Sequence, residues 1–389
     1  STVQYSEDGE ERWNTEHQTT PEAPLVHRRL ARMLENGCEY AVLEASSHGL
    51  SPRTNRLGDV SFDAGIMTNV THEHLEFHGT WEQYRDDKAN LFRVLDANVK
   101  SGVHGMEPFG VVNADDPSAA YFAGCTRRKT YSHSVKGFGG ADLAVCGLTP
   151  HPGGNVYDVK VRDGGTLHIE DRLPGAFNAG NVLASLLCVS RLLGKSYAEL
   201  CPLVPELKPV RGRMTAVQRG QPFEVLVDYA HTPSSFEKVF PPLRERLDRQ
   251  GGRLIALFGS AGERDTKKRA LQGIIAARYS DMIFLCDEDP RGEEPAAILE
   301  EIAAGIFSLP PAECFQHEGF TRGANLFLIP DRPAAIRAAF SKAKPCDIVL
   351  LLGKGHENSI IYSGHTMKYD EISEAENALL EFGWGNVNR

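Results

Sequence analysis

Residues 222–235 read Pro-Phe-Glu-Val-Leu-Val-Asp-Tyr-Ala-His-Thr-Pro-Ser-Ser, a short apolar run that ends abruptly in a polar turn. The aliphatic residues Val225–Val227 are typical of a buried strand, and Thr232 followed by Pro233 is typical of a helix N-cap with proline at the first helical position. In open α/β sheets, ligands bind at the carboxyl ends of the strands. We therefore expect the polar residues of this turn to lie where chemistry takes place.

The same order of strand, polar turn and helix recurs along the chain and predicts an α/β fold with mostly parallel sheets. In the first half, strand-like runs occur at Tyr40–Leu43, Ala64–Thr68 and Phe109–Val112, and helical patterns at Leu25–Asn36, Trp81–Leu95 and Asn178–Leu193. Short alternating runs at Asn155–Val161 and Thr166–Ile169 predict antiparallel strands at the sheet edge. In the second half, strand-like runs occur at Val225–Val227, Leu254–Phe258, Met282–Leu285 and Ile348–Leu352.

A proline-rich linker separates the two halves. Pro202, Pro205 and Pro209 interrupt the chain just before the second series of strands begins. Such punctuation is typical of a domain boundary. We expect two domains, residues 1–207 and 208–389.

Composition narrows the class of protein. The formal net charge of −10 and the isoelectric point near 5.8 argue against nucleic acid or an anionic membrane as the main partner. No apolar run approaches the roughly 18 residues that a membrane span needs, and no secretory signal opens the chain. The eight cysteines form no C-x-x-C pair, which indicates reduced thiols. We expect a cytoplasmic, monomeric enzyme.

Two polar segments follow strand-like runs in the first half. Glu44-Ala45-Ser46-Ser47-His48 places a carboxylate, two hydroxyls and an imidazole in one turn; the alternative is structural, with Ser46 as a helix N-cap. Thr71-His72-Glu73-His74-Leu75-Glu76-Phe77-His78-Gly79 holds three histidines and two acids. Its spacing matches no zinc motif, so Mg²⁺ with few protein ligands is favoured over Zn²⁺. A solvated polar loop is the alternative.

Three glycine-containing segments are candidates for phosphate-binding loops. A Walker A loop reads G-x-x-x-x-G-K-[ST]. Gly194-Lys195-Ser196 has its last three residues, but Val189 stands where the first glycine is required, so this is a helix end. Gly353-Lys354-Gly355-His356-Glu357 and Gly259–Asp265 each follow a strand and offer backbone N–H groups to an anion, with tight glycine turns as the alternative.

These motifs continue in further segments, and the whole series spans nearly the entire chain. The additional segments are Gln18-Thr19-Thr20-Pro21-Glu22, Tyr84–Phe92, Asn113–Pro117, Gly175–Asn181, Pro209–Met214, Asp228–Pro233 and Asp287–Pro295. In this order they resemble the Mur ligases, and among them the branch that adds a diamino acid to a UDP-muramoyl-dipeptide in peptidoglycan precursor synthesis.

The resemblance implies a truncated ATP-binding central domain over residues 1–207 and a Rossmann-like domain over residues 208–389. Family members also have an N-terminal uridine domain and a Walker A loop, and neither is found in these residues. Two explanations stay open: a fragment of a longer ligase, or a form that does not bind ATP phosphates in the family manner. In the second case the chain is a non-catalytic module that binds a muropeptide or a protein partner. Another Mur ligase or a folylpolyglutamate-synthetase-like enzyme is a further alternative.

The resemblance also implies ATP-dependent amide-bond formation through an acyl-phosphate. It assigns Mg²⁺ binding to Glu44, His74 and a carbamylated Lys88. Without the resemblance, Lys88 would be interpreted as a solvated lysine on a helix. Catalytic roles go to Lys88, Arg213 and His74. Among the ATP contacts that the resemblance assigns, Asn178 and Asn181 lie near the adenine, Asp228 contacts the ribose with His231 beside it, and Arg213 reaches the γ-phosphate. It assigns contacts to the UDP-muramoyl-dipeptide to Thr19, Thr20, Ser46 and Arg56.

The diamino-acid site is assigned to Arg264, Glu288, Asp289, Arg291, Gly353 and Glu357. Arg291 favours meso-diaminopimelate, because a guanidinium binds a distal carboxylate in a bidentate manner. Asp289 stands where diaminopimelate-adding members have asparagine, and its charge suits the distal ammonium of lysine or ornithine. The residues favour diaminopimelate only slightly.

Overall fold

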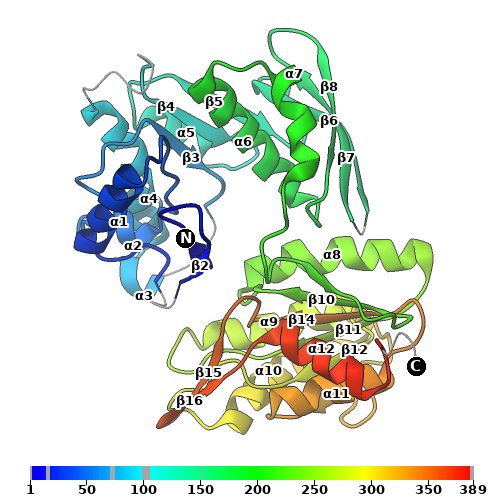
Figure 1. Ribbon diagram of the computed structural model, residues 1–389. Coiled ribbons are helices and arrows are strands. Elements are labelled where there is room, and N and C mark those ends of the chain that lie inside the picture. The colour runs from blue at the N-terminus through cyan, green and yellow to red at the C-terminus, as the bar shows by residue number, and fades with distance from the viewer. Residues whose placement is uncertain (1, 15–17, 71–74, 99–105, 152, 386–389) are drawn as a thin grey trace. The chain divides into compact units, whose positions relative to one another are not determined.

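The computed structural model describes residues 2–14, 18–70, 75–98, 106–151 and 153–385 (Figure 1). The chain forms two compact units, Ser1–Lys208 and Pro209–Arg389. All eight cysteines are free thiols.

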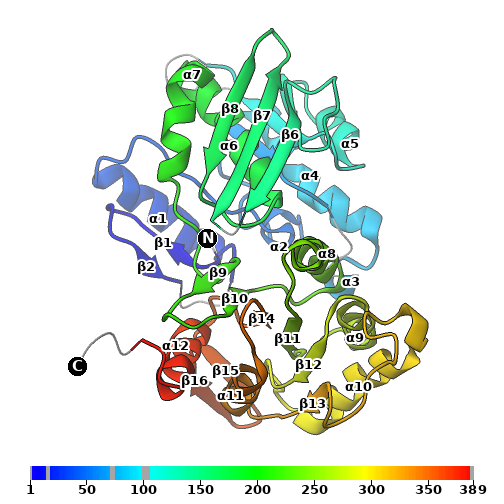
Figure 2. The ribbon, with the colours of Figure 1, turned by 90° about the vertical axis from the view of Figure 1, so that its right-hand side faces the viewer.

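The first unit is built on a six-stranded sheet in the order β3-β4-β5-β6-β7-β8. Its strands are Ala64–Met67, Phe109–Asn113, Thr130–Ser134, Leu143–His151, Gly154–Val161 and Thr166–Asp171. Strands β3 to β6 are parallel, whereas β7 and β8 are antiparallel, and Figure 2 shows β6, β7 and β8 side by side. The predicted antiparallel edge is therefore confirmed.

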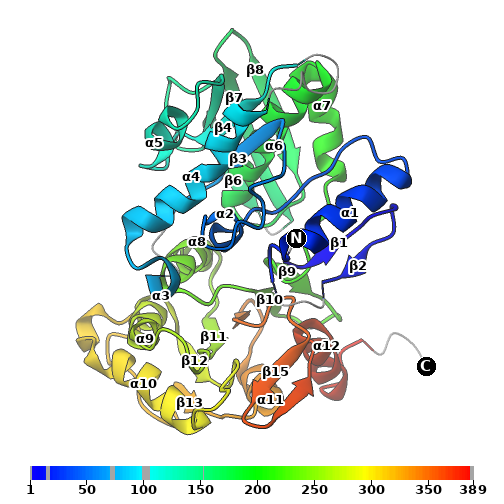
Figure 3. The same ribbon diagram turned by 90° about the vertical axis from the view of Figure 1, so that its left-hand side faces the viewer.

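Helices cover both faces of this sheet. Buried side chains of α6 (Phe177–Leu193) pack on one face, and those of α4 (Trp81–Ala97) and α5 (Ala119–Gly124) on the other. Figure 3 shows α4 beside β3 and β4. The remaining elements are β1 (Gln4–Tyr5), β2 (Arg12–Trp13), α1 (Ala23–Glu35), α2 (Ser47–Leu50), α3 (Leu75–His78), α7 (Tyr197–Leu200) and the 3-10 helix η2 (Cys201–Glu206).

The strand predicted at Tyr40–Leu43 is absent from the structure. Residues 39–46 have no regular secondary structure, and the side chain of Val42 is 93% exposed. An extended segment becomes a stable strand only when a neighbour takes up its N–H and C=O groups. Among the described residues no strand pairs with this segment, so its apolar composition alone did not make it a strand.

The second unit contains a six-stranded sheet in the order β13-β12-β11-β14-β10-β9, parallel except for the antiparallel edge strand β9. The strands are Thr215–Val217 (β9), Glu224–Asp228 (β10), Leu254–Phe258 (β11), Met282–Leu285 (β12), Leu326–Leu328 (β13) and Ile348–Leu352 (β14). The interior strands β11 and β14 are buried throughout, which explains their continuous apolar runs. A hairpin of β15 (Ser359–Tyr362) and β16 (His365–Lys368) forms a separate small sheet.

Helices again pack on both faces. One face carries α8 (Pro233–Gln250), α9 (Lys267–Tyr279) and α10 (Pro295–Ser308), and the other carries α11 (Arg332–Lys342) and α12 (Glu371–Glu381). The short 3-10 helix η3 spans Pro311–Glu313. The N-cap of α8 is Thr232, whose side chain accepts a hydrogen bond from the Ser235 N–H, with proline at the first helical position as predicted.

In the described part of the chain, no single helix has the length and apolar composition to cross a membrane. Only α6 together with the segment Tyr197–Glu206 meets those two criteria jointly, and the pair is bent by 115°. The apolar residues of α6 are buried against the sheet of the first unit.

His133 on β5 is a buried imidazole that makes folding sensitive to acid. Burial lowers the pKa of His133 from 6.5 to about 4, with nearby Asp115 opposing the shift, and neither ring nitrogen has a hydrogen-bond partner among the described residues. Between these pH values the unfolded imidazole binds a proton and the folded one does not, so stability falls as the pH falls from 6.5 to 4. We expect a loss of at most about 3 kcal/mol across this window.

Replacing His133 by leucine is expected to flatten this dependence, because it removes the group that titrates. Urea unfolding of the chain at pH 7, 5.5 and 4.5 measures the slope. His168→Leu is the matched control, since the His168 side chain is 70% exposed. Equal slopes for His133→Leu and the unsubstituted chain would contradict the assignment.

Candidate active site

In the first unit, the predicted substrate-binding residues gather around Thr20. The Thr20 hydroxyl donates to the carbonyl of Glu44 (2.9 Å) and accepts from the N–H of Ser46 (3.0 Å), while Arg56 donates to the Thr20 carbonyl (3.0 Å). Gly49 permits this approach, because a Cβ there would lie 2.6 Å from the Thr20 side chain. Residues far apart in the sequence thus lie together around Thr20.

Thr19 joins the same turn through Thr2. The Thr2 hydroxyl donates to the Thr19 hydroxyl (2.9 Å), and its N–H donates to the carboxylate of Glu44 (2.7 Å). Ser46 also caps α2, since its hydroxyl accepts from the N–H of Gly49 (3.1 Å). The structural alternative for Ser46 is therefore observed, and any substrate contact would be made in addition to the cap.

The predicted magnesium ligands can be compared only in part. Glu44 is exposed and Lys88 is half-buried on α4, with its Nζ 5.2 Å from the centre of the Tyr84 ring. His74 lies outside the described residues. Within the described residues, no three His, Cys, Asp or Glu side chains group as a metal site. A carboxylate and a carbamate would nevertheless supply oxygen ligands of the kind that Mg²⁺ prefers.

The two asparagines assigned to the adenine lie at the start of α6. Asn181 donates to the side-chain carbonyl of Asn178 (2.8 Å), and Asn178 donates to the carbonyl of Pro174 (2.8 Å). The structure therefore holds these two amides as a linked pair, with Asn181 exposed. Amide groups of this kind can both donate to and accept from the edge of a base.

In the second unit, the parallel strands end together, which brings the polar turns that follow them to one edge of the sheet. The register pairs Asp228 with Leu352, Leu257 with Leu351 and Phe258 with Leu285. Four turns then meet at this edge: residues 229–232, 259–266, 286–294 and 353–358. This is the edge at which ligands bind in such sheets.

Asp228 holds the backbone beside Arg213. Its two carboxylate oxygens accept from the N–H groups of Met214 (2.8 Å) and Ala230 (2.7 Å). Burial raises the pKa of Asp228 although both hydrogen bonds favour the carboxylate. Arg213 itself lies over the ring of Tyr229, with its guanidinium carbon 4.8 Å from the ring centre. Asp228 thus has a structural role in addition to the predicted ribose contact.

His231 and the glycine turn after β14 meet on either side of Tyr229. The Nδ1 of His231 lies 2.8 Å from the Tyr229 carbonyl, which identifies it as the protonated nitrogen. The hydroxyl of Tyr229 donates to Glu357 (3.2 Å), and its ring is 4.6 Å from that of His356. A Cβ at Gly355 would lie 2.7 Å from Tyr229, so only glycine fits there.

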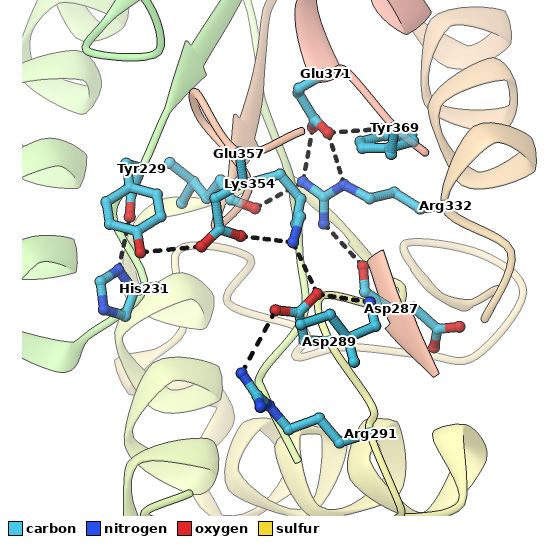
Figure 4. A network of polar contacts seen from close by, with 12 residues as sticks. Tyr229, His231, Asp287, Asp289, Arg291, Arg332, Lys354, Glu357, Tyr369 and Glu371 are labelled. Atoms are coloured by element: carbon cyan, nitrogen blue, oxygen red, sulfur yellow. Dashed lines mark hydrogen bonds and ion pairs between the residues drawn. The ribbon is translucent and has the colours of Figure 1, made fainter. Parts of the chain in front are cut away.

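Three consecutive acids after β12, Asp287 to Asp289, are buried, and Figure 4 shows Lys354 in contact with the last of them. The fully buried Lys354 donates to Asp289 (2.8 Å) and to Glu357 (2.5 Å). Burial opposes ionisation of Glu357, but Lys354, His231 and Tyr229 together outweigh burial and hold the pKa of Glu357 below its usual range. Burial raises the pKa of Asp287 to about 6.

The middle acid, Glu288, differs from its neighbours. Its Oε2 is buried and has no hydrogen-bond partner among the described residues, and a Cβ at Gly353 would lie 3.0 Å from it. Asp289, in contrast, is satisfied by Lys354 and by the N–H of Ile361 (3.0 Å). A buried, unpaired carboxylate attracts a cation. Glu288 is therefore better placed than Asp289 to receive an ammonium group.

Arg291 adds a positive group to the same turn. Its backbone is left-handed, with a φ of 56°, and its N–H donates to the carbonyl of Ile361 (2.9 Å). One terminal nitrogen lies 3.9 Å from Asp289, and Nε has no hydrogen-bond partner among the described residues. The guanidinium therefore keeps donors for a carboxylate. Arg264, by comparison, is exposed, although the neighbouring Gly262 N–H donates to the carbonyl of Asp289 (2.8 Å).

A second buried cation, Arg332, binds the backbone at the start of two of these turns. Arg332 is fully buried, pairs with Glu371 (2.7 Å) and donates to the carbonyls of Asp287 (3.1 Å) and Leu352 (2.7 Å). Those carbonyls immediately precede Glu288 and Gly353. No role for Lys354 or Arg332 could be predicted from the sequence. Lys354 belongs to the glycine motif at residues 353–357, whereas no sequence motif includes Arg332.

Comparison with known proteins identifies the family. The chain matches the Mur ligase middle domain over residues 1–189 and the Mur ligase, glutamate ligase domain over residues 212–355. A UDP-N-acetylmuramyl-tripeptide synthetase from Treponema denticola is 51% identical over 98% of this chain and 70% of its own length. The chain belongs to the Mur ligase family. The predicted family, fold class and enzyme class, an ATP-dependent acid–amino-acid ligase, are confirmed.

Other Mur ligases extend the comparison. A UDP-N-acetylmuramoyl-L-alanyl-D-glutamate–2,6-diaminopimelate ligase from Geobacillus thermodenitrificans is 33% identical over 93% of this chain and 69% of its own. A solved structure with that ligase name superposes with a TM-score of 0.59 at 28% identity, over 96% of this chain and 71% of the other. The Mycobacterium tuberculosis folylpolyglutamate synthase, with a TM-score of 0.61 over 91% of this chain and 72% of the other, is 15% identical and shares the fold alone. These relatives favour a ligase over a non-catalytic module.

Proposed function

We propose that this Mur ligase chain belongs to an enzyme that joins meso-diaminopimelate to the terminal carboxylate of UDP-MurNAc-L-Ala-D-Glu with consumption of ATP. The observation that carries the proposal is one turn with two opposite, incompletely paired charges, Glu288 and Arg291. The distal carbon of diaminopimelate bears an ammonium and a carboxylate. Glu288 suits the ammonium and Arg291 the carboxylate.

Relatives support the same assignment. The Geobacillus thermodenitrificans protein and the solved ligase both carry diaminopimelate in their names. Lysine or ornithine would satisfy Glu288 but would leave the buried Nε of Arg291 without an acceptor. An unmatched buried donor costs free energy, so the site should discriminate against both amino acids.

The proposed chemistry has two steps. An oxygen of the substrate carboxylate attacks the γ-phosphorus, the bond to the ADP oxygen breaks, and an acyl-phosphate forms. The amine nitrogen of the diamino acid then attacks the acyl carbon, the carbon–oxygen bond to phosphate breaks, and the nitrogen loses a proton as the amide forms. Cationic groups must surround the phosphoryl group, because negative charge spreads over its oxygens during transfer.

The resemblance to the family supports the following roles for this chain's residues. Arg213 would meet the γ-phosphate, Asn178 and Asn181 the adenine, and Asp228 and His231 the ribose side. Glu44, His74 and a carbamate on Lys88 would hold Mg²⁺, which neutralises phosphate charge when it is bound. Thr20 would hold the dipeptide substrate, together with Thr19, Ser46 and Arg56.

Replacing Arg291 by alanine is expected to raise KM for diaminopimelate on the order of 10- to 100-fold, because a charge-assisted bidentate pair is lost. Lysine and ornithine lack the distal carboxylate, so their KM values should rise far less. Ligation kinetics with the three amino acids measure the difference. The G-x-x-x-x-G-K-[ST] pattern does not occur in these 389 residues, so the assay uses the chain joined to a segment that supplies it.

Glu288→Gln is the matched variant, because it removes a charge from the same turn without removing Arg291. It should weaken the binding of all three amino acids and so raise each KM, since each amino acid carries a distal ammonium. If the unsubstituted enzyme prefers lysine or ornithine, and Arg291→Ala penalises all three equally, the diaminopimelate assignment is wrong.

A further inference from the structure

A buried chain of hydrogen bonds connects three helices of the first unit. The Nδ1 of His78, at the end of α3, lies 2.7 Å from Asp87 on α4, and its Nε2 lies 3.1 Å from the hydroxyl of Ser47 on α2. The exposed fractions of the three residues are 2%, 1% and 3%. Gln83 donates to the second oxygen of Asp87 (2.8 Å), so this carboxylate has a partner on each oxygen.

The partners fix where the protons lie. An ionised carboxylate only accepts hydrogen bonds, so the Nδ1 of His78 carries the proton that Asp87 receives. In the neutral imidazole Nε2 is then the acceptor, and the Ser47 hydroxyl donates to it. This order has the form of a serine–histidine–aspartate chain, but Ser47 is too deeply buried to reach a substrate. A nucleophilic role for Ser47 is therefore excluded. The hydrogen bonds instead fix the positions of α2, α3 and α4 relative to one another.

The two helices that His78 connects carry separate parts of the proposed site. On one side, Ser47 is the first residue of α2, directly after Ser46, whose N–H donates to Thr20. On the other side, Asp87 directly precedes Lys88 on α4. Figure 3 shows α2 beside α4, and the side chain of Asn90 on α4 donates to the carbonyl of Leu50 at the end of α2 (3.0 Å).

A ring contact gives His78 a second link to Lys88. The imidazole meets the ring of Tyr84 edge-on, with 5.2 Å between ring centres, and the Nζ of Lys88 lies 5.2 Å from the centre of the same ring. On the α2 side, the ring of His48 packs 5.4 Å from His78. His78 therefore contacts α4 at both Asp87 and Tyr84, and the Tyr84 ring in turn contacts Lys88.

We propose that His78 is a positioning residue. It holds Ser46, which contacts Thr20 at the start of α2, and Lys88 on α4 at a fixed separation. The inference rests on the proposed function, because it assigns Lys88 and the Thr20 turn to one reaction. Apolar side chains would hold the two helices together, but hydrogen bonds also restrict distance and direction. A fully satisfied buried polar network specifies one arrangement in this way. Reaction rates depend on such placement, since an error of about 1 Å can cost 10²-fold.

The first test uses the 389-residue chain and needs no activity. His78→Leu removes both hydrogen bonds and keeps a buried apolar group, and His78→Gln keeps a donor and an acceptor. We expect faster amide hydrogen exchange in residues 46–51 and 81–90 of His78→Leu, with partial protection restored in His78→Gln. Val159→Ala, a buried truncation on β7, is the control for a general loss of stability and should leave both segments protected.

The second test measures ligation in the assay described above. We expect His78→Leu to lower kcat on the order of 10- to 100-fold, with a smaller change in KM for the diamino acid, and His78→Gln to recover part of kcat. Val159→Ala should keep kcat. Unchanged exchange in residues 46–51 and 81–90 of His78→Leu overturns the proposal, as does an unchanged kcat. If the unsubstituted enzyme forms no amide bond, the proposed function fails, and the exchange result alone decides the role of His78.

Discussion

Replacing Lys88 by alanine is expected to lower ligation by at least roughly 10²- to 10³-fold, the cost of losing one group that stabilises developing charge. The reason is that a carbamate on Lys88 would be an anionic ligand for Mg²⁺, whereas an ammonium would repel the ion. The structure places Lys88 on a helix next to the buried Asp87, with its Nζ over the Tyr84 ring. Bicarbonate or a short-chain carboxylic acid, added at millimolar concentration, should restore part of the activity.

Lys129→Ala is the matched control. Lys129 is also a lysine of the first unit whose Nζ lies over a tyrosine ring, 4.8 Å from the centre of Tyr131. Its loss should not change the rate, and added carboxylic acid should not affect it. Full activity in Lys88→Ala without rescue would show that Lys88 is a solvated lysine, as its sequence context alone suggested.

The strands of the second unit could be predicted from the sequence because burial on both faces leaves an unmistakable pattern. The runs Leu254–Phe258 and Ile348–Leu352 became β11 and β14 with the predicted bounds. The run Tyr40–Leu43 has a similar composition but no partner among the described residues, so it forms no strand. Composition therefore indicates which segments can become strands, and pairing decides which of them do.

The site was predictable as a set of turns, but not as a set of contacts. The glycine turn after β14 was recognised, yet its lysine lies 65 residues from its partner Asp289, and no local pattern reports such a pair. The same applies to Asp289, whose charge suggested a contact with substrate and which the structure shows engaged by Lys354. Glu288 emerges as the unpaired acid only after all neighbours are in place.

The largest expected effect on stability lies beneath that site. Arg332→Met should destabilise the second unit by about 3–5 kcal/mol, because it leaves Glu371 as an uncompensated buried charge. Both side chains are fully buried. Burial lowers the pKa of Arg332, but Glu371, Cys286 and Tyr369 together raise it further, so the guanidinium stays charged. The carbonyls of Asp287 and Leu352 lose their donors at the same time. Urea unfolding followed by amide exchange in β12 and β14 reports the change in this unit.

A double variant separates the buried charge from the loss of packing. Arg332→Met combined with Glu371→Leu removes both charges, so it should cost less than the sum of the two single substitutions. Arg322→Met is the exposed control, since Arg322 pairs with Glu300 at side-chain exposures of 53% and 50%, and it should leave the unfolding midpoint nearly unchanged. Additive costs in the double variant would contradict the coupling. The turns that begin at Glu288 and Gly353 would then owe their positions to strand pairing, with no contribution from the Arg332–Glu371 pair.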